Sequence, residues 1–236
     1  MYKRQGIPLG YGGPHAAYFS TKEEYKRNLP GRIIGVSIDQ NGNRALRMAL
    51  QTREQHIKRD RATSNICTAQ VLLAVMAGMY AVFHGPDGLK EIAKKIHSNA
   101  CILEENLNLL GFKTPNKSFF DTILVECDSK LIRGKALEKE VNFHYPNDSS
   151  VSISINETTT TNDIYEIISI FAESKNTKLE NFSNFESLNR IPKEYSRTSS
   201  FLTDEVFSKY KSETSLMRYI KFLEKKDLAL NTSMIS

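Results

Sequence analysis

The sequence has no apolar run of the roughly 18 residues that a membrane-spanning helix needs. At Met1 it also lacks the basic-then-apolar leader of a secreted protein. Its three cysteines, Cys67, Cys101 and Cys127, lie far apart and in no spacing typical of a metal site. An odd number of separated cysteines argues against a disulfide framework and favours a reducing compartment. These absences predict a cytoplasmic protein with no membrane segment and no metal site.

The chain has no long segment in which basic or acidic residues predominate. The 32 Lys and Arg residues outnumber the 27 Asp and Glu residues and give a net charge of +5, but they are scattered. We therefore expect no nucleic-acid partner, whereas binding of a small anionic molecule stays open. Two phosphate-binding signatures are also missing, because the chain contains neither the Gly-Lys-Ser/Thr of a Walker A loop nor a dinucleotide fingerprint between a strand and a helix.

The most unusual stretch is the loop Gly6–His15, which holds four glycines and two prolines in ten residues. This composition excludes a helix or a central strand, because glycine admits positive φ and proline removes a hydrogen-bond donor. The consecutive amides of Gly12 and Gly13 suit a nest for an anion such as a phosphate. A tight connection between two strands explains the same residues equally well, so both interpretations stay open.

The residues after this loop predict a βαββ segment. We expect a strand at His15–Ser20, a short helix capped by Thr21 and stopped by Pro30-Gly31, and strands at Ile33–Ile38 and Ala45–Gln51 around the turn Gln40–Asn43. Because the chain reaches its glycine-rich loop after only five residues, we expect the amino-terminal part of the fold to be missing or to come from another chain.

The segment Thr52–Thr68 is rich in basic and polar side chains. It is either a solvated helix with ion pairs such as Glu54 with Lys58, or an anion-binding segment at the rim of an active site. The next residues, Ala69–Phe83, are apolar nearly all round and predict a buried core helix. A break at His84–Gly88 separates it from a second helix.

The rest of the chain predicts a compact α+β domain and a tail. We expect a helix at Leu89–Leu110 with Gly111 as its C-cap, strands at Phe119–Cys127, Val141–Tyr145 and Val151–Ile155, and helices at Lys130–Lys139 and Thr161–Glu173. The run Thr158–Thr161 offers hydroxyls to a ligand or, more simply, ends a strand and caps the next helix. After the polar linker Ser174–Ser200, the helix Ser212–Asp227 has a capping box at Ser212-Glu213 and an apolar face that needs a partner surface.

Five stretches together carry a resemblance to a known family: GIPLGYGGPHAAYF, KEEYKRNLPGRIIGVSID, ALRMALQTREQHIKRDRATSNICTAQ, INETTTT and SLMRYIKFLEKKDLALNTSMIS. In this order they resemble the P-protein of the glycine cleavage system, the pyridoxal-phosphate-dependent glycine decarboxylase. The resemblance spans nearly the whole chain and is weakest between Lys175 and Arg197. That family has two related halves, and this chain resembles the later part of the first half.

The resemblance implies an α/β fold, namely part of the large domain of a fold-type I, aminotransferase-like pyridoxal-phosphate transferase, followed by a small α+β domain. On this basis residues 1–88 are expected to be the remnant of the large domain, and residues 89–173 the linking helix and the small domain. Residues 174–236 are expected to be a linker and an interface helix that leads toward the second half.

The resemblance also implies a reaction. Glycine would lose its carboxyl group as CO2 and pass its aminomethyl group to the lipoyl group of the H-protein, with pyridoxal 5'-phosphate as the cofactor. The lysine that carries the cofactor belongs to the second half of the family, so this chain alone is expected to be inactive. The expected partners are that second half, the lipoylated H-protein and glycine, in a homodimer or heterotetramer when complete.

Carried over residue by residue, the family pattern assigns roles to the glycine-rich loop. Gly12 and Gly13 would donate amides to the cofactor phosphate of a partner half, and Tyr11 and His15 would line the pocket. Lys3 precedes this loop where the cofactor lysine precedes the related loop of the second half, which makes it a candidate Schiff-base residue. The alternative for Lys3 is a solvated lysine at a frayed terminus.

The same pattern places four residues of the polar segment near the substrate or a subunit interface: Arg53, His56, Asn65 and Thr68. Arg53 is the candidate for a carboxylate or phosphate contact, because its guanidinium binds such groups in a bidentate manner. Two hypotheses follow. The chain either completes the cofactor site of a partner half, or it is a catalytically silent scaffold that supplies only an interface and a docking surface for the H-protein.

Overall fold

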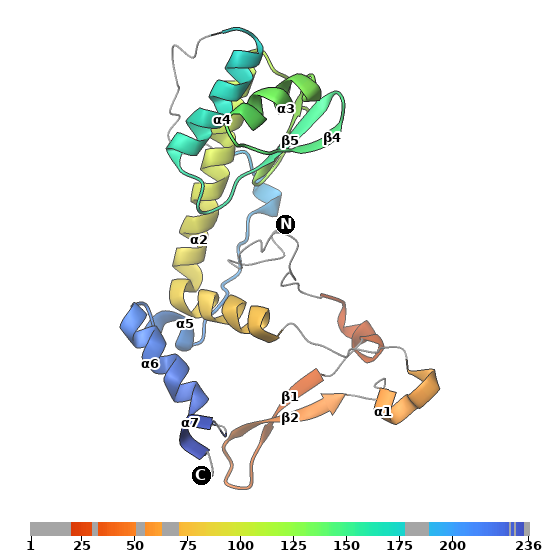
Figure 1. Ribbon diagram of the computed structural model, residues 1–236. Coiled ribbons are helices and arrows are strands. Elements are labelled where there is room, and N and C mark those ends of the chain that lie inside the picture. The colour runs from red at the N-terminus through yellow and green to blue at the C-terminus, as the bar shows by residue number, and fades with distance from the viewer. Residues whose placement is uncertain are drawn as a thin grey trace. The chain divides into compact units, whose positions relative to one another are not determined.

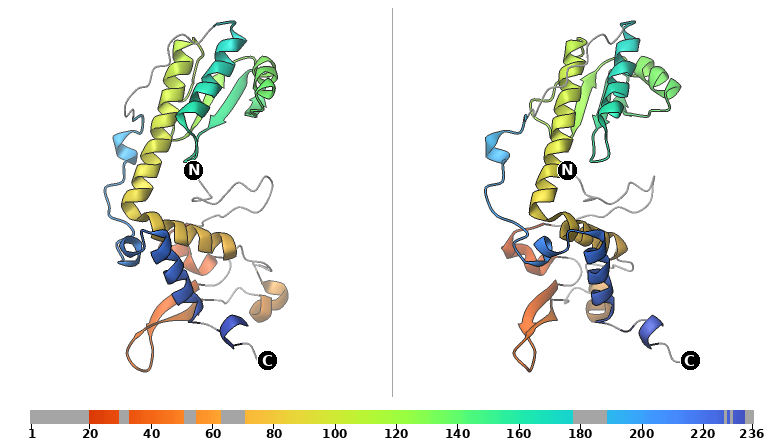
Figure 2. Two further views of the ribbon diagram at one scale, coloured as in Figure 1. Left: turned by 60° about the vertical axis from the view of Figure 1, so that its left-hand side comes forward. Right: turned by 90° about the vertical axis from the view of Figure 1, so that its left-hand side faces the viewer.

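The computed structural model describes residues 20–29, 33–50, 55–62, 71–177, 189–226, 228 and 230–233. The chain divides into two compact units, Met1–Ala81 and Val82–Ser236, which are described one at a time. Figures 1 and 2 show the helices and strands of each unit. The loop Gly6–His15, and the strand expected after it as far as Phe19, lie outside the described residues.

The first unit contains the predicted hairpin, formed by β1 (Ile33–Ile38) and the antiparallel β2 (Arg44–Leu50). The carboxylate of Asp39 holds its turn, because Oδ1 accepts hydrogen bonds from the backbone N–H groups of Asn41 and Asn43, both at 2.8 Å. Gly42 follows with a φ of 81°, which glycine adopts without strain. The turn that the sequence predicts at Gln40–Asn43 is therefore confirmed, whereas the role of Asp39 was not predicted.

The described residues of this unit also form the short helices η2 (Glu23–Asn28), α1 (Gln55–Lys58) and η3 (Arg59–Arg61). The prediction that Thr21 caps the first of them is wrong. That helix is a 3₁₀-helix whose first turn closes between the Tyr25 N–H and the Lys22 carbonyl at 3.0 Å. Thr21 therefore lies one residue too early to cap it, and no side chain takes that role.

The longest helix, α2 (Val71–Leu109), is interrupted at Gly85, whose φ of 62° and ψ of −173° are not helical. The break predicted at His84–Gly88 is confirmed, although the helix resumes at once with Pro86, which a first helical turn tolerates. A Cβ atom at Gly85 would overlap the carbonyl oxygen of Phe207 and Nζ of Lys211. Both the positive φ and the close approach therefore require glycine here.

The prediction that Ala69–Phe83 is a buried core helix is wrong for most of its described part. Val71 and Leu72 are 61% and 71% exposed, whereas Ala81 is buried. An apolar pattern predicts burial, but burial also needs a covering layer. None of the residues that the structure describes supplies that layer for the first two turns of α2.

The second unit contains strands and helices close to those predicted after Gly111. Its antiparallel sheet has the order β3-β5-β4, from β3 (Thr122–Glu126), β5 (Ser150–Ser154) and β4 (His144–Asn147), and its helices are α3 (Ser129–Glu138) and α4 (Thr161–Ser174). The inward pairs Ile123 with Ile153 and Val125 with Val151 are buried. They join side chains of α2 and α4, such as Leu103, Leu107, Ile164 and Phe171, in one core.

The strand predicted at Val141–Tyr145 is displaced toward the C-terminus. β4 begins at His144 and pairs with β5 through His144 opposite Ser152 and Asn147 opposite Ser150. Val141 is not available to the sheet, because its N–H donates to the Ala136 carbonyl at 2.9 Å and closes the end of α3.

The end of α2 is capped as the sequence predicts. Gly111 has a φ of 77°, its N–H donates to the Asn108 carbonyl at 2.8 Å, and the next N–H donates to the Leu107 carbonyl at 3.0 Å. Lys175, just after α4, adds a cationic cap. Its Nζ donates to the carbonyls of Leu110 and Gly111 at 2.8 and 3.0 Å, where the helix dipole favours positive charge.

The last part of the second unit holds η4 (Lys193–Tyr195), α5 (Val206–Lys209), α6 (Glu213–Glu224) and α7 (Leu230–Ser233). Ser212 caps α6 as predicted, but its reciprocal partner is Ser215 rather than Glu213. The Ser215 N–H donates to Oγ of Ser212 at 3.3 Å, and the Ser212 N–H donates to Oγ of Ser215 at 3.1 Å. In both figures the chain before α5 runs back along α2.

Candidate functional site

Most of the residues that the sequence nominates for a site lie outside the described residues: Lys3, Tyr11, Gly12, Gly13, His15, Arg53, Asn65 and Thr68. His56 is described. It lies in α1, a single turn of helix, and its side chain is exposed. The roles assigned to these residues therefore stay predictions.

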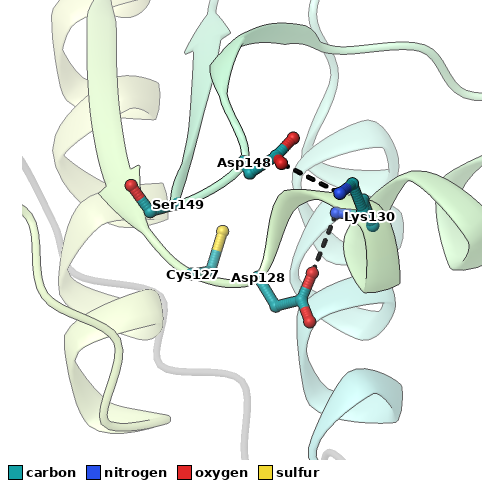
Figure 3. A pocket seen from close by; sticks show the side chains of 5 residues that line it. All are labelled: Cys127, Asp128, Lys130, Asp148 and Ser149. Carbon is teal, nitrogen blue, oxygen red and sulfur yellow. Dashed lines mark hydrogen bonds and ion pairs between the residues drawn. The ribbon is translucent and has the colours of Figure 1, made fainter.

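A hollow in the second unit lies beside the start of α3 and is lined by Cys127, Asp128, Lys130, Asp148 and Ser149 (Figure 3). Asp128 points toward the backbone of α3 and caps it, since Oδ1 accepts from the N–H groups of Lys130 at 3.0 Å and Leu131 at 3.2 Å. Nζ of Lys130 pairs with the carboxylate of Asp148 at 2.8 Å. Each charged side chain of the hollow therefore already has a partner: Lys130 and Asp148 form an ion pair, and Asp128 accepts hydrogen bonds from the start of α3.

Cys127 is the nucleophile candidate of this hollow, but its surroundings make it unreactive. Burial raises the pKa of its thiol to about 11, and the neighbouring carboxylate of Asp128 adds to the rise. The thiol is therefore protonated at neutral pH, whereas the thiolate is the nucleophilic form. This hollow was not predicted from the sequence, although Asp128 before α3 is a typical helix cap.

A second polar cluster of the same unit lies on α2 and surrounds the buried side chain of His97. The backbone N–H of Arg190 donates to Nε2 of His97 at 2.8 Å, so the imidazole proton lies on Nδ1, which donates to the Phe120 carbonyl at 2.7 Å. The guanidinium of Arg190 pairs with Glu104, 3.3 Å away, and with Glu105. Through these contacts the backbone and side chain of Arg190 are bonded to α2, and His97 of α2 is bonded to the residue Phe120 just before β3.

Long-range contacts of this kind were not predicted from the sequence. The polar composition of Ser174–Ser200 indicates a linker, and nothing in it distinguishes Arg190 from its neighbours. His97 and Glu104 are both buried on α2, and buried polar side chains need polar partners, but this burial is not visible in the sequence.

The threonine run takes the simpler of its two interpretations. Oδ1 of Asn156 accepts from the Thr158 N–H at 3.0 Å and from the hydroxyls of Thr158 and Thr159 at 2.8 and 3.2 Å. The hydroxyl of Thr160 accepts from the Asp163 N–H at 3.2 Å in a capping box that starts α4. The hydroxyls thus close a turn and a helix start, as the N-cap interpretation predicts.

Two further properties hold for the described part of the chain. It contains no group of three or more His, Cys, Asp or Glu residues placed to hold a metal ion. No helix in it combines the length and the apolar character that crossing a bilayer requires.

Comparison with known proteins gives consistent matches. The family model described as "Glycine cleavage system P-protein" matches residues 2–171. A glycine dehydrogenase (decarboxylating) of Flavobacterium johnsoniae is 62% identical over 234 residues, which cover 99% of this chain and 25% of that protein. The same name is given to a relative from Christiangramia forsetii with the same identity and coverage, and to one from Bacteroides fragilis that is 50% identical over 99% of this chain and 25% of its own length.

A solved structure is also similar. It is a crystal structure of glycine decarboxylase (P-protein) of the glycine cleavage system in inhibitor-bound form, with a TM-score of 0.64 and 31% sequence identity. The similarity covers 72% of this chain and 41% of that one. The chain therefore has a mixed α/β fold similar to that protein, and it spans about a quarter of the length of the relatives above.

Proposed function

Because the chain belongs to the glycine cleavage system P-protein family, we propose that it is part of a pyridoxal-phosphate-dependent glycine decarboxylase. The complete enzyme would release the carboxyl group of glycine as CO2 and pass the aminomethyl group to the lipoyl group of the H-protein. The observation that carries this proposal is 62% identity over 99% of the chain to a glycine dehydrogenase (decarboxylating).

The proposal includes the partners and the setting of the reaction. A polypeptide that carries the cofactor lysine, the lipoylated H-protein and glycine are the expected partners, and the assembly is a homodimer or a heterotetramer in the cytoplasm. This chain without the lysine-bearing half is expected to be inactive. When bound, pyridoxal phosphate supplies the electron sink for decarboxylation.

The hollow beside α3 does not fit the phosphate of that cofactor. The amides of Lys130 and Leu131 are already bonded to Asp128, and the ammonium group of Lys130 is paired with Asp148. We therefore assign the phosphate to the amides of Gly12 and Gly13, as the family pattern suggests. Tyr11 and His15 would line that pocket.

The remaining assigned residues would act at the edge of the site. Arg53 would hold a carboxylate or phosphate with its guanidinium fork, and His56, Asn65 and Thr68 would lie near the substrate or the subunit interface. The exposed side chain of His56 agrees with a surface that another polypeptide covers.

The test replaces the two loop glycines in a full-length enzyme. A chimera is made in which this chain of 236 residues replaces the matching 234 residues of the Flavobacterium johnsoniae relative. In this chimera the double variant Gly12→Ala, Gly13→Ala is compared with the single variant Gly134→Ala. Gly134 lies in α3, where an added Cβ meets nothing within 4 Å, so it is a matched substitution without a clash. We expect weaker cofactor binding and slower glycine decarboxylation only in the double variant.

An unchanged cofactor affinity and decarboxylation rate in the double variant would favour the scaffold hypothesis instead, in which the chain supplies only an interface and a docking surface for the H-protein. A third hypothesis makes Lys3 a Schiff-base residue. Borohydride reduction of the cofactor-loaded protein followed by peptide mapping tests it, and the absence of an adduct on Lys3 would end it.

A further inference from the structure

The turn of the hairpin holds the only Asn-Gly pair of the sequence, Asn41-Gly42. Both residues are exposed. The side chain of an asparagine can close a five-membered ring with the backbone nitrogen of the next residue, and a side chain on that next residue hinders the closure. Glycine has no Cβ and therefore hinders it least. The pair combines a thermolabile residue with the neighbour that most favours its loss of ammonia.

The carboxamide of Asn41 is free to react. Among the residues that the structure describes it makes no hydrogen bond, whereas the backbone N–H of Asn41 donates to Oδ1 of Asp39 at 2.8 Å. The carboxamide of Asn43 differs, because its Nδ2 donates to Oδ2 of Asp39 at 3.4 Å and the residue after it is an arginine. The hairpin therefore holds one free and one bonded asparagine side chain, and the free one precedes glycine.

One hydrogen bond restrains the nitrogen that would attack. The N–H of Gly42 donates to the Asp39 carbonyl at 3.1 Å, near the upper limit for such bonds. Asp39 also holds the turn around it, since its carboxylate accepts from the N–H groups of Asn41 and Asn43 and its own N–H donates to the Asn43 carbonyl at 2.8 Å. Attack needs the Gly42 bond to open, and exposed turns open locally at a small cost in free energy.

We propose that Asn41 is a site of spontaneous deamidation and that the hydrogen bonds of Asp39 set its rate. The backbone nitrogen of Gly42 loses its proton and forms a bond to Cγ of Asn41. The bond between Cγ and Nδ2 breaks, and Nδ2 takes up a proton and leaves as ammonia. Water then opens the cyclic imide at either carbonyl and gives aspartate or isoaspartate. The reaction needs only water, and the inference does not depend on the proposed function.

Either product changes the turn. A carboxylate replaces a neutral amide two residues from Asp39, whose own pKa is held below its usual value by the hydrogen bond from the Asn43 N–H, so that two like charges share the turn. Isoaspartate also adds one carbon to the backbone between Asp39 and Gly42. The bonds that join Asp39 to Gly42 and Asn43 then no longer fit, and we expect the end of the hairpin to loosen as the protein ages.

The test follows deamidation in the full-length chimera, in which this chain replaces the matching residues of the Flavobacterium johnsoniae relative. The chimera is aged in warm, mildly alkaline buffer and digested with trypsin. The peptide 33–44 carries both Asn41 and Asn43, so tandem mass spectrometry reads the site and its internal control together. We expect Asn41 to deamidate at least about tenfold faster than Asn43, because only Asn41 precedes a residue without a Cβ. An isoaspartyl methyltransferase detects the isoaspartate product.

Asp39→Ala tests the role of the turn. In the folded chimera it should speed the deamidation of Asn41 by about threefold or more, whereas in denaturant, where no turn exists, the rates with and without Asp39 should agree. The matched control is Asp60→Ala, which removes an exposed carboxylate of η3 and should leave the rate unchanged.

Two results would overturn the inference. One is a folded chimera in which Asn41 deamidates no faster than Asn43, and the other is an Asp39→Ala variant that keeps the parental rate when folded. Neither experiment measures decarboxylation, so a chimera that deamidates at Asn41 but does not decarboxylate glycine would count against the proposed function alone.

Discussion

Replacing Arg190 by methionine removes a guanidinium group from a nearly buried carboxylate while keeping an aliphatic stem of similar length. Arg190 lies 3.3 Å from Oε2 of Glu104, whose side chain is only 5% exposed. The other oxygen, Oε1, accepts a hydrogen bond from the Thr114 hydroxyl at 3.1 Å. Oε2 accepts no hydrogen bond in the described structure, so the ion pair with Arg190 is what compensates its charge.

The size of the loss follows from the burial of the two partners. Removing one partner of a fully buried pair costs about 3–5 kcal/mol, because it leaves an uncompensated charge. Arg190 is 42% exposed, so water can approach Glu104 from that side once the guanidinium is gone. We therefore expect Arg190→Met to lower the free energy of unfolding of the second unit by about 1.5–2.5 kcal/mol, roughly half of the buried value.

Urea unfolding followed by far-ultraviolet circular dichroism measures this free energy. The matched control is Lys130→Met, since Lys130 and Asp148 form a pair whose side chains are 77% and 79% exposed. Its effect should stay below about 0.5 kcal/mol. Adding Glu104→Gln to Arg190→Met should recover part of the loss, because the orphaned charge disappears. Equal effects of Arg190→Met and Lys130→Met, or a double variant no more stable than Arg190→Met, would refute the reasoning.

Four further outcomes follow from the second unit. Burial raises the pKa of Cys127 from the ordinary 9.0 to about 11, so its alkylation near neutral pH should be about 100-fold slower than that of an ordinary thiol, and a rate equal to that of a free thiol would be inconsistent with burial. Because the unfolded thiol ionises first, the free energy of unfolding should fall as the pH rises above 9.0. Gly85→Ala should destabilise the chain by about 2 kcal/mol or more, because its positive φ and the close approach of α5 exclude a Cβ, whereas Gly134→Ala should be neutral or stabilising in the same denaturation assay. Thr160→Ala should cost about 1 kcal/mol through loss of the α4 cap, while Thr160→Ser, which keeps the hydroxyl, should cost much less.

Most strands and helices of the second unit were readable from local patterns. Alternating apolar residues predict strands near β3 and β5, and glycines with a positive φ, such as Gly42 and Gly111, mark a turn and a helix end correctly. These features depend on neighbours within a few residues, which a sequence displays directly. The error at Val141 has the same origin, because a β-branched residue suggests a strand while its N–H is already used by the end of α3.

Features that depend on distant parts of the polypeptide were not readable. The start of α2 is apolar but exposed. An apolar pattern shows which face of a helix is suited to burial, but it does not show which other segment covers that face. The contact of Arg190 with His97 joins residues 93 positions apart, and no local signal pairs them. The site residues near the glycine-rich loop lie outside the described residues, so their assignment rests on family resemblance.

The central claim is that these residues are a working part of a glycine decarboxylase. The most direct measurement is the exchange of labelled CO2 into the carboxyl group of glycine by the Flavobacterium johnsoniae relative in two forms. In one form this chain replaces the 234 matching residues, and in the other those residues are deleted. We expect exchange in the chimera and none in the deletion variant. A deletion variant that keeps the exchange, or a folded and cofactor-loaded chimera that lacks it, would contradict the claim.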